Sequence, residues 1–297
     1  MKRNSSIFLT LTASIFSSAV FAQTNTLQLK MDSIINSKKA DVGVSVLYLS
    51  DQRIVSVNGD KHYPMQSVYK FHLALAVLNQ VDQGKFKLDQ KILVKKSDLL
   101  PDTWSPLREK YPNGNVELPL SEILKYTVSE SDNNGCDILF RLIGGTSKAH
   151  QFIRKQGIKE ISIVGTEEEM HKDDQVQFRN WTTPKAANAL LKKFHEGKVL
   201  KKTTGDFLMK VMEETVTGPG KIKGLLPQGT VVAHKTGNSG VNKEGITAAS
   251  NDIGIVTLPN GKKMLISAFV SMSKENDKEN DKIIAELAKA AFEEGLK

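Results

Sequence analysis

The chain begins and ends in segments with the alternating, β-branched composition of strands, and a block of helices separates them. The early strands are predicted at residues 42–49 and 53–57, and the late ones at 230–233, 246–258 and 262–270. The pair Asn260-Gly261, between the last two strands, is a hairpin signal. This order predicts an α/β (α+β) fold, in which an antiparallel five-stranded sheet flanked by helices is built from both chain ends.

Helices are predicted in the intervening block at residues 67–81, 118–126, 132–142, 146–155 and 183–195, and nearer the ends at 27–36 and 277–292. Thr183-Pro184 is a strong helix start, and Thr146 is a candidate cap. We therefore expect a single domain over residues 23–297. Its all-helical lobe would span residues 63–207, and its α/β lobe residues 23–62 and 208–297.

The first 22 residues have the pattern of a secretory signal peptide. Lys2 and Arg3 precede a mostly apolar stretch, and Val20-Phe21-Ala22 fits a cleavage site. An ordinary buried N-terminal helix is the alternative. Because the stretch is short and rich in Ser and Thr, it is a poor transmembrane helix. The sequence therefore predicts a secreted protein without a stable membrane anchor.

Charge and cysteine content exclude several classes of function. The net charge is +8 over the whole chain. The charged residues are spread out, without an arginine-rich block or interleaved aromatics, so nucleic acid is not an expected partner. The single cysteine, Cys136, excludes an intrachain disulfide and a cysteine-based metal site, and it lies in an apolar run typical of packing. The histidines at 62, 72, 150, 195 and 234 lack metal-ligand spacing, so no metal is expected.

The first motif with catalytic residue types is Ser67-x-x-Lys70, at a predicted helix start. This spacing puts the lysine amine one turn after the hydroxyl and on the same helix face. A serine hydroxyl needs a neighbouring base to become a good nucleophile, and free N–H groups at a helix start favour an oxyanion. Alone the motif is weak, because Ser271-x-x-Lys274 matches it too.

Two further motifs follow. Ser131-Asp132-Asn133 is either a helix cap or a cap whose Ser131 and Asn133 also face a cleft. Lys235-Thr236-Gly237 comes at the end of a predicted strand, where it is either a charged strand end with a turn or the edge of a pocket. In the second case Lys235 supplies positive charge and Gly237 permits close approach of substrate.

The three motifs in this order, over nearly the whole mature chain, resemble the signature of the penicillin-recognising serine enzymes. Class A serine β-lactamases add a glutamate on a loop between the second and third motifs. Here three adjacent glutamates precede Thr183-Pro184, and aligning the family's loop end on that pair puts the catalytic glutamate at Glu167. Glu168 is the fallback, and an acidic solvated loop is the alternative.

Several departures from the common pattern resemble the PER/VEB-like extended-spectrum branch. His171 stands where most members have the asparagine that holds the hydrolytic water, and Asp137 stands where most have another asparagine. Gln66 before the nucleophile and Asn-Gly-Cys after the second motif are further features of this branch. The resemblance implies His171 as the water-positioning residue, since a histidine can also hold a water.

The resemblance also implies a substrate-binding set. Trp104 matches an aromatic gatepost, although a half-buried structural tryptophan fits equally. Lys221 falls near an arginine that binds the substrate carboxylate in relatives, and lysine supplies charge without a bidentate fork. The full set is Asn133, Lys235, Thr236, Asn238, Ser239, Trp104 and Lys221.

The implied activity is hydrolysis of the β-lactam amide of penicillins and cephalosporins through a Ser67 acyl-enzyme, which confers antibiotic resistance. Lys70 or Glu167 would be the base for acylation, Ser131 would return a proton to the leaving nitrogen, and Glu167 would activate water. We expect a periplasmic monomer without cofactors. Two alternatives remain: a penicillin-binding DD-peptidase that deacylates slowly, and a non-catalytic cell-wall binding module.

Overall fold

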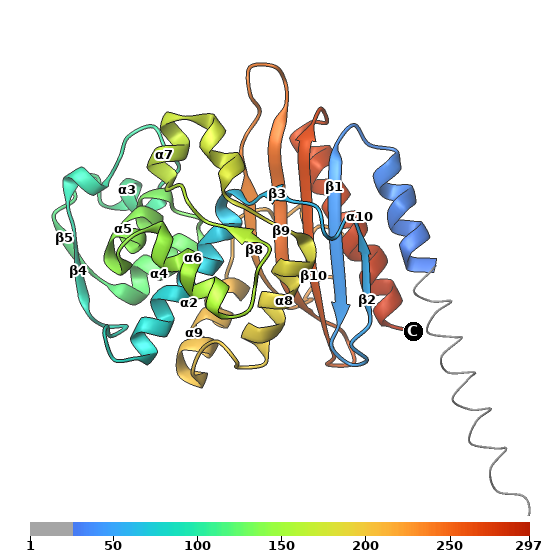
Figure 1. Ribbon diagram of the computed structural model, residues 1–297, viewed down its shortest axis with the longest axis horizontal. Helices are drawn as coiled ribbons and strands as arrows, with labels where there is room; N and C mark the ends of the chain where they lie inside the picture. Colours follow the sequence, from blue (N-terminus) through green and yellow to red (C-terminus); the bar gives the residue numbers. More distant parts are fainter. Residues whose placement is uncertain (1–25) are drawn as a thin grey trace, which may run out of the picture.

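The computed structural model describes residues 26–297, so the predicted signal peptide lies outside the described residues. Residues 26–36 are helical, as predicted. A five-stranded antiparallel sheet stands at the centre, with helices on both of its faces (Figure 1). Within residues 26–297, no helix is long and apolar enough to cross a membrane.

The central sheet joins the two ends of the chain, as predicted. Its strand order is β2-β1-β10-β9-β8, and β1 pairs with β10 along its whole length. β8 is therefore an edge strand, and it runs further than predicted because Lys235 pairs with Ile253 and Gly237 with Asn251. The third motif is thus part of the strand and does not follow it. The strands are β1 (Asp41–Tyr48), β2 (Ile54–Val57), β8 (Val232–Asn238), β9 (Thr247–Thr257) and β10 (Lys263–Ser273).

Helices, short strands and 3₁₀ turns connect β2 to β8, and a long helix ends the chain. The α-helices are α2 (Tyr69–Asp82), α3 (Pro106–Lys110), α4 (Leu120–Ser129), α5 (Asn133–Ile143), α6 (Thr146–Lys155), α7 (Glu167–Lys172), α8 (Pro184–His195), α9 (Lys202–Glu213) and α10 (Asp277–Gly295). The short strands are β3 (Tyr63–Pro64), β4 (Lys91–Val94), β5 (Val116–Pro119), β6 (Ile161–Ser162) and β7 (Trp181–Thr182). The 3₁₀ turns are η1 (Gln66–Val68), η2 (Lys96–Asp98) and η3 (Asp174–Arg179).

Some predicted helix starts are wrong by a few residues. Leu118 belongs to β5, where it pairs with Ile92, so the helix expected there begins at Leu120. Thr146 is not a cap: Gly145 occupies that position, and the Thr146 hydroxyl donates to the carbonyl of Val164. Helix α9 was not predicted at all.

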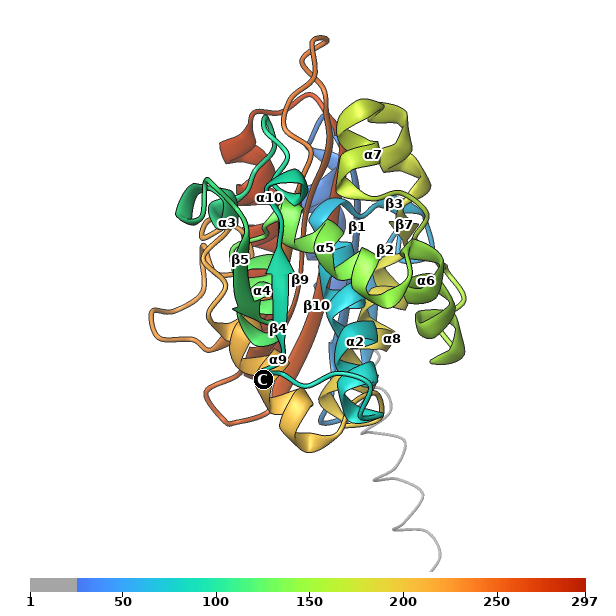
Figure 2. The ribbon, with the colours of Figure 1, turned by 90° about the vertical axis from the view of Figure 1, so that its left-hand side faces the viewer.

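Hydrophobic side chains are buried on both faces of the sheet. Helix α10 and residues 26–36 cover one face, and the remaining helices lie on the other (Figures 1 and 2). Helix α2 is buried all round from Tyr69 to Leu78, as expected for a helix in the centre of a core. The segment that leads into α2 meets the edge strand β8, and this junction brings the first and third motifs together.

Candidate active site

Lys70 lies at the centre of the residues predicted to be catalytic. Its side chain is fully buried, and its Nζ donates to Ser67 Oγ at 2.9 Å and to the Ser131 carbonyl at 2.8 Å. It also donates to Asn133 Oδ1 at 2.5 Å and lies 3.0 Å from Glu167 Oε1. An ammonium group has three protons, and four oxygens surround this one. The site therefore holds an ammonium and the nucleophile in direct contact.

The second motif combines both of its predicted roles. Asp132 caps α5 by accepting from the Gly135 N–H, and it also accepts from Ser105 Oγ and the Leu107 N–H. Burial raises the pKa of Asp132. Ser131 has a φ of +59°, a conformation that a residue other than glycine keeps only when its surroundings hold it. The cap thus holds the backbone that presents the Ser131 carbonyl to Lys70.

Lys235 links the third motif to the second. Its Nζ donates to Ser131 Oγ at 2.9 Å and to the Thr236 carbonyl. Burial, together with the ammonium of Lys70, lowers the pKa of Lys235 well below its usual range. Thr236 Oγ1 shares a 2.6 Å hydrogen bond with Thr217 Oγ1. The hydroxyl of Ser131 is therefore connected to the side-chain nitrogen of Lys235 on the edge strand.

Gly237 allows β8 to approach the segment that carries Ser67. A Cβ at this position would lie 2.5 Å from the Met65 carbonyl oxygen and 3.3 Å from Ser67 N. On the paired strand, the side chain of Asn251 donates to the carbonyls of Pro64 and Met65. The close approach that was expected for substrate is, in this structure, an approach of one backbone to another.

The three adjacent glutamates have three different partners. Glu169 accepts from the Thr166 N–H in a capping box, and Glu168 pairs with Lys172 at 2.7 Å. Glu167 is buried and contacts Lys70. The pattern Thr-x-x-Glu at residues 166–169 is a capping signal that the sequence analysis missed. It would have predicted the start of α7 and left Glu167 or Glu168 to face the site.

Asp137 binds the N-terminus of α7. Its two carboxylate oxygens accept from the N–H groups of Glu167 and Glu168, each at 2.9 Å. A negative charge at a helix N-terminus is favourable. Burial and the nearby charge of Glu167 nevertheless raise the pKa of Asp137 to about 6. Asp137, noted only as a departure from the family pattern, therefore positions Glu167.

Asn180 joins the two ends of the loop that carries Glu167. Its Oδ1 accepts from the N–H groups of Val164 and Gly165, and its Nδ2 donates to the Gly165 carbonyl. The side chain is fully buried. Gln66 ties the loop to the nucleophile segment, because its Nε2 donates to Gln177 Oε1 at 2.6 Å. Sequence reasoning did not single out Asn180, since an asparagine before a strand carries no distinctive signal.

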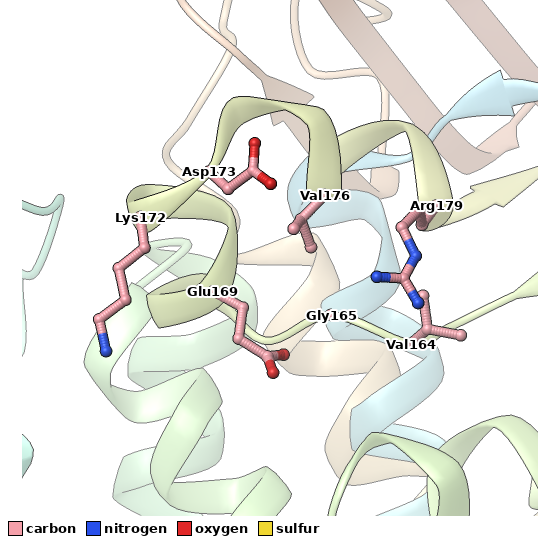
Figure 3. A pocket seen from close by; sticks show the side chains of 7 residues that line it. All are labelled: Val164, Gly165, Glu169, Lys172, Asp173, Val176 and Arg179. Atoms are coloured by element: carbon pink, nitrogen blue, oxygen red, sulfur yellow. The ribbon is translucent and has the colours of Figure 1, made fainter.

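The loop also has a hollow on its outer side. This hollow has a volume of about 310 Å³, and Figure 3 shows the residues of α7, η3 and the preceding segment that line it. None of the residues that contact Lys70 lines it, so it is separate from the site. The lining residues are Val164, Gly165, Glu169, Lys172, Asp173, Val176 and Arg179.

Three predicted substrate-binding residues lie at the rim. Trp104 is 58% exposed, so it is not half-buried, and its Nε1 donates to the Glu130 carbonyl. Asn238 is exposed at the end of β8, where its Oδ1 accepts from the Gly240 N–H. Ser239 follows it and donates to the Gly240 carbonyl. Their arrangement leaves the Trp104 ring and the end of β8 open to a ligand.

Two predicted residues form no hydrogen bond with the side chain of any other predicted site residue. His171 is exposed in the last turn of α7, and its side chain makes no hydrogen bond or ion pair within residues 26–297, so its water-positioning role stays a prediction. Lys221 is 2% exposed, and its Nζ donates to the carbonyls of Gly237 and Asn251. Direct binding of a substrate carboxylate by Lys221 is therefore wrong for this structure, because its protons are directed at backbone carbonyls.

The competing sequence matches have structural roles. Ser271 lies in β10, and its hydroxyl donates to the Ala248 carbonyl. Cys136 is fully buried against the Tyr69 hydroxyl, and burial raises the pKa of its thiol well above the usual range. Within residues 26–297, no group of three or more His, Cys, Asp or Glu side chains is arranged to hold a metal ion.

The chain belongs to the β-lactamase enzyme family, whose model matches residues 26–294. It is 48% identical to β-lactamase VEB-1 of Pseudomonas aeruginosa over 94% of both chains. It is 47% identical to extended-spectrum β-lactamase PER-1 of the same organism, over 93% of this chain and 89% of PER-1. The crystal structure of TLA-1 extended-spectrum β-lactamase matches with a TM-score of 0.91 and 58% identity, over 92% of this chain and 99% of TLA-1.

Fold and site therefore define a class A β-lactamase, a hydrolase of β-lactams. Within that class, the chain falls in the PER/VEB-like branch that its motifs resembled.

Proposed function

We propose that Ser67 is the acylated nucleophile and that Glu167 activates the water that hydrolyses the acyl-enzyme. The observation that carries this proposal is the position of Lys70, 2.9 Å from Ser67 Oγ and 3.0 Å from Glu167 Oε1. The buried carboxylate and the hydroxyl are thus linked through one ammonium. Either of them can exchange a proton with it without a change in the fold.

Two proton routes are considered for acylation. In one route, Glu167 takes the Ser67 proton through a water. In the other, Lys70 first gives a proton to Glu167 across 3.0 Å, and the free amine then takes the proton of Ser67. An ammonium has no lone pair for the serine proton, so in the second route Lys70 must lose a proton before it accepts one. In Glu167→Gln, Lys70 can lose its proton to solvent and still take the Ser67 proton as a free amine, whereas no base remains for the hydrolytic water.

The leaving nitrogen would receive its proton from Ser131. Lys235 Nζ donates to Ser131 Oγ, so the hydroxyl can pass its own proton on while the cation stabilises its oxygen. The substrate carboxylate would bind at Lys235 and Thr236, and a bound carboxylate would favour the charged form of Lys235. Trp104, Asn133, Asn238 and Ser239 would complete the rim.

The carbonyl oxygen of the substrate would enter an oxyanion hole formed by the N–H groups of Ser67 and Asn238. The Ser239 N–H donates across the ladder to the Ala249 carbonyl. In an antiparallel ladder, successive N–H groups point to opposite sides of a strand, so the Asn238 N–H points away from β9. β8 is an edge strand, so the sheet does not use that N–H, and the neighbouring residue Gly237 lies against the segment that carries Ser67.

We further propose that this enzyme hydrolyses cephalosporins, including extended-spectrum ones, and acts in the periplasm after removal of residues 1–22. The similarity to extended-spectrum enzymes supports the first statement. The basic and apolar pattern of the leader supports the second. The site would lie between an α/β lobe (residues 23–62 and 208–297) and a helical lobe (63–207).

The decisive experiment compares Glu167→Gln with Glu168→Gln. With nitrocefin and mass spectrometry of the intact protein, Glu167→Gln should accumulate a covalent adduct on Ser67 that the parent enzyme does not accumulate. Glu168→Gln should turn over normally. A parent enzyme that itself stays acylated for hours would indicate a DD-peptidase, and a parent that forms no adduct and hydrolyses no nitrocefin would indicate a binding module.

A further inference from the structure

We infer that Lys221 is a positioning residue of the oxyanion hole, which it supports from the opposite face of the sheet. Its Nζ donates to the carbonyl of Gly237, at 3.1 Å. That carbonyl belongs to the peptide unit whose N–H is the N–H of Asn238. This inference rests on the proposed function, in which that N–H binds the carbonyl oxygen of the substrate.

Lys221 and Ser67 lie on opposite faces of the sheet. The Cβ position of Gly237 and the side chain of Asn251 both point to the segment before Ser67. Successive residues of a strand alternate between faces, so Thr236 and Asp252 face the other way. On that side Asp252 accepts from the Ile222 N–H, and Lys221 lies 3.8 Å from Asp281 of helix α10.

Lys221 contacts a single pair of opposite residues in strands β8 and β9. Gly237 pairs with Asn251, and Lys221 Nζ donates to both of their carbonyls, at 3.1 and 3.2 Å. Carbonyl groups lie close to the plane of a sheet, so a cation can reach them from either face. Lys221 therefore fixes the orientation of the Gly237–Asn238 peptide plane without entering the substrate site.

A cation on the carbonyl oxygen also changes the N–H of the same peptide. The positive charge draws electron density toward the oxygen and makes the N–H a stronger donor, as in a chain of hydrogen bonds that polarise one another. Burial lowers the pKa of Lys221, and three carboxylates, those of Asp281, Asp252 and Asp277, oppose this effect by favouring the charged form. The charge of Lys221 is thus aligned with the dipole of the Gly237–Asn238 peptide, whose N–H faces the oxyanion.

The test measures the strength of the hydrogen bonds in the oxyanion hole. In the Glu167→Gln background, the ester carbonyl of the trapped acyl-enzyme gives an infrared stretch whose frequency rises as hydrogen bonding weakens. Lys221→Met should move this stretch to higher frequency. Lys221→Arg, which keeps the charge, should leave the stretch close to its frequency in the background enzyme. Lys223→Met is the matched control, because Lys223 donates to the Thr215 carbonyl instead.

Steady-state kinetics of the enzyme that keeps Glu167 give a second readout. Lys221→Met should lower kcat/KM about tenfold, below the ~10²–10³-fold loss typical of removing an oxyanion-hole donor outright. The loss should fall mainly on kcat, since a residue that bound the substrate carboxylate would raise KM instead. If Lys221→Met does not fold, Lys221→Gln, which keeps a donor but not the charge, should give a shift in the same direction.

The two proposals fail in different ways. If Glu167→Gln accumulates no acyl-enzyme, the proposed function is wrong. If the acyl-enzyme forms and its carbonyl stretch is the same in Lys221→Met, Lys221→Gln and the parent background, the inference about Lys221 is overturned while the proposed function stands.

Discussion

Asp137 accepts the backbone N–H of Glu167 at 2.9 Å, so the carboxylate beneath α7 holds in place the carboxylate proposed to activate water. The folded structure raises the pKa of Asp137 from 3.8 to about 6, mainly through burial. A raised pKa means that the acid form is favoured in the folded state. Its contribution to stability is complete below about pH 4 and is lost as pH rises through 6.

The first prediction is therefore a pH-dependent effect of Asp137→Asn. The free energy of unfolding of the parent minus that of the variant should fall by about 2–3 kcal/mol between pH 4 and 7.5. Urea unfolding at several pH values measures this difference, and the exposed Asp206→Asn is the control. A difference that is the same at both pH values would contradict the assignment.

His72 has the opposite dependence on pH. It is buried in α2, its Nδ1 lies 3.2 Å from the Val68 carbonyl, and its Nε2 has no hydrogen-bond partner among residues 26–297. Burial lowers its pKa from 6.5 to about 4, so the folded state excludes the charged form. The stability of the parent should thus fall by about 3 kcal/mol through this group as pH drops from 6.5 to 4.

The variant His72→Leu should lose this acid-side decrease and keep that of every other group. Urea unfolding over the same pH range tests the prediction, and His171→Gln is the control because His171 is exposed. If His72→Leu shows the parent's acid-side slope, the imidazole is not the group that titrates.

Asn180 should affect deacylation more than acylation. Asn180→Ala would leave the buried N–H groups of Val164 and Gly165 without an acceptor, at a cost of about 2–4 kcal/mol in the free energy of unfolding. Because the loop it closes carries Glu167, the acyl-enzyme should accumulate during turnover, as mass spectrometry of the intact protein can show. Asn180→Asp keeps both acceptor bonds, and its protonated form can also donate to the Gly165 carbonyl, so below the pKa of that acid it should have a smaller effect than Asn180→Ala. Equal effects there would show that the Oδ1 contacts do not matter.

The sheet was predictable because its strands have a strong two-residue pattern and a hairpin signal at Asn260-Gly261. The order of the three motifs was equally informative, since Ser271-x-x-Lys274 matches the first motif but lies in β10, away from Lys70. Local patterns of this kind do not depend on how distant segments pack. Helical spacing predicted that Lys70 lies beside Ser67, whereas the place of Ser131 next to them was expected only from the resemblance to the penicillin-recognising serine enzymes.

The position of Lys221 was not predictable in the same way. Its sequence neighbourhood indicates a turn close to the third motif, but not the face of the sheet on which the turn lies. That face is set by α10, which contributes Asp281 from far along the chain. The extension of β8 through Lys235 was missed for a related reason, because charged residues in a strand are explained only by partners such as Ser131.

Gly237 gives the last prediction. A Cβ there would lie 2.5 Å from the Met65 carbonyl oxygen, a backbone atom that cannot turn aside, so Gly237→Ala should push the Ser67 segment away from β8. A displacement of this kind can cost about 10²-fold in rate, so kcat/KM for nitrocefin should fall by that order while the protein stays folded.

Gly205→Ala is the matched control, because a Cβ at Gly205, in helix α9, meets no atom within 4 Å. It should leave kcat/KM unchanged and stabilise the helix by about 0.5–1 kcal/mol. An unchanged rate in Gly237→Ala would mean that the Ser67 segment can move back without loss of the oxyanion hole. In that case the approach of the two backbones is a matter of packing alone, and the geometry of catalysis does not depend on it.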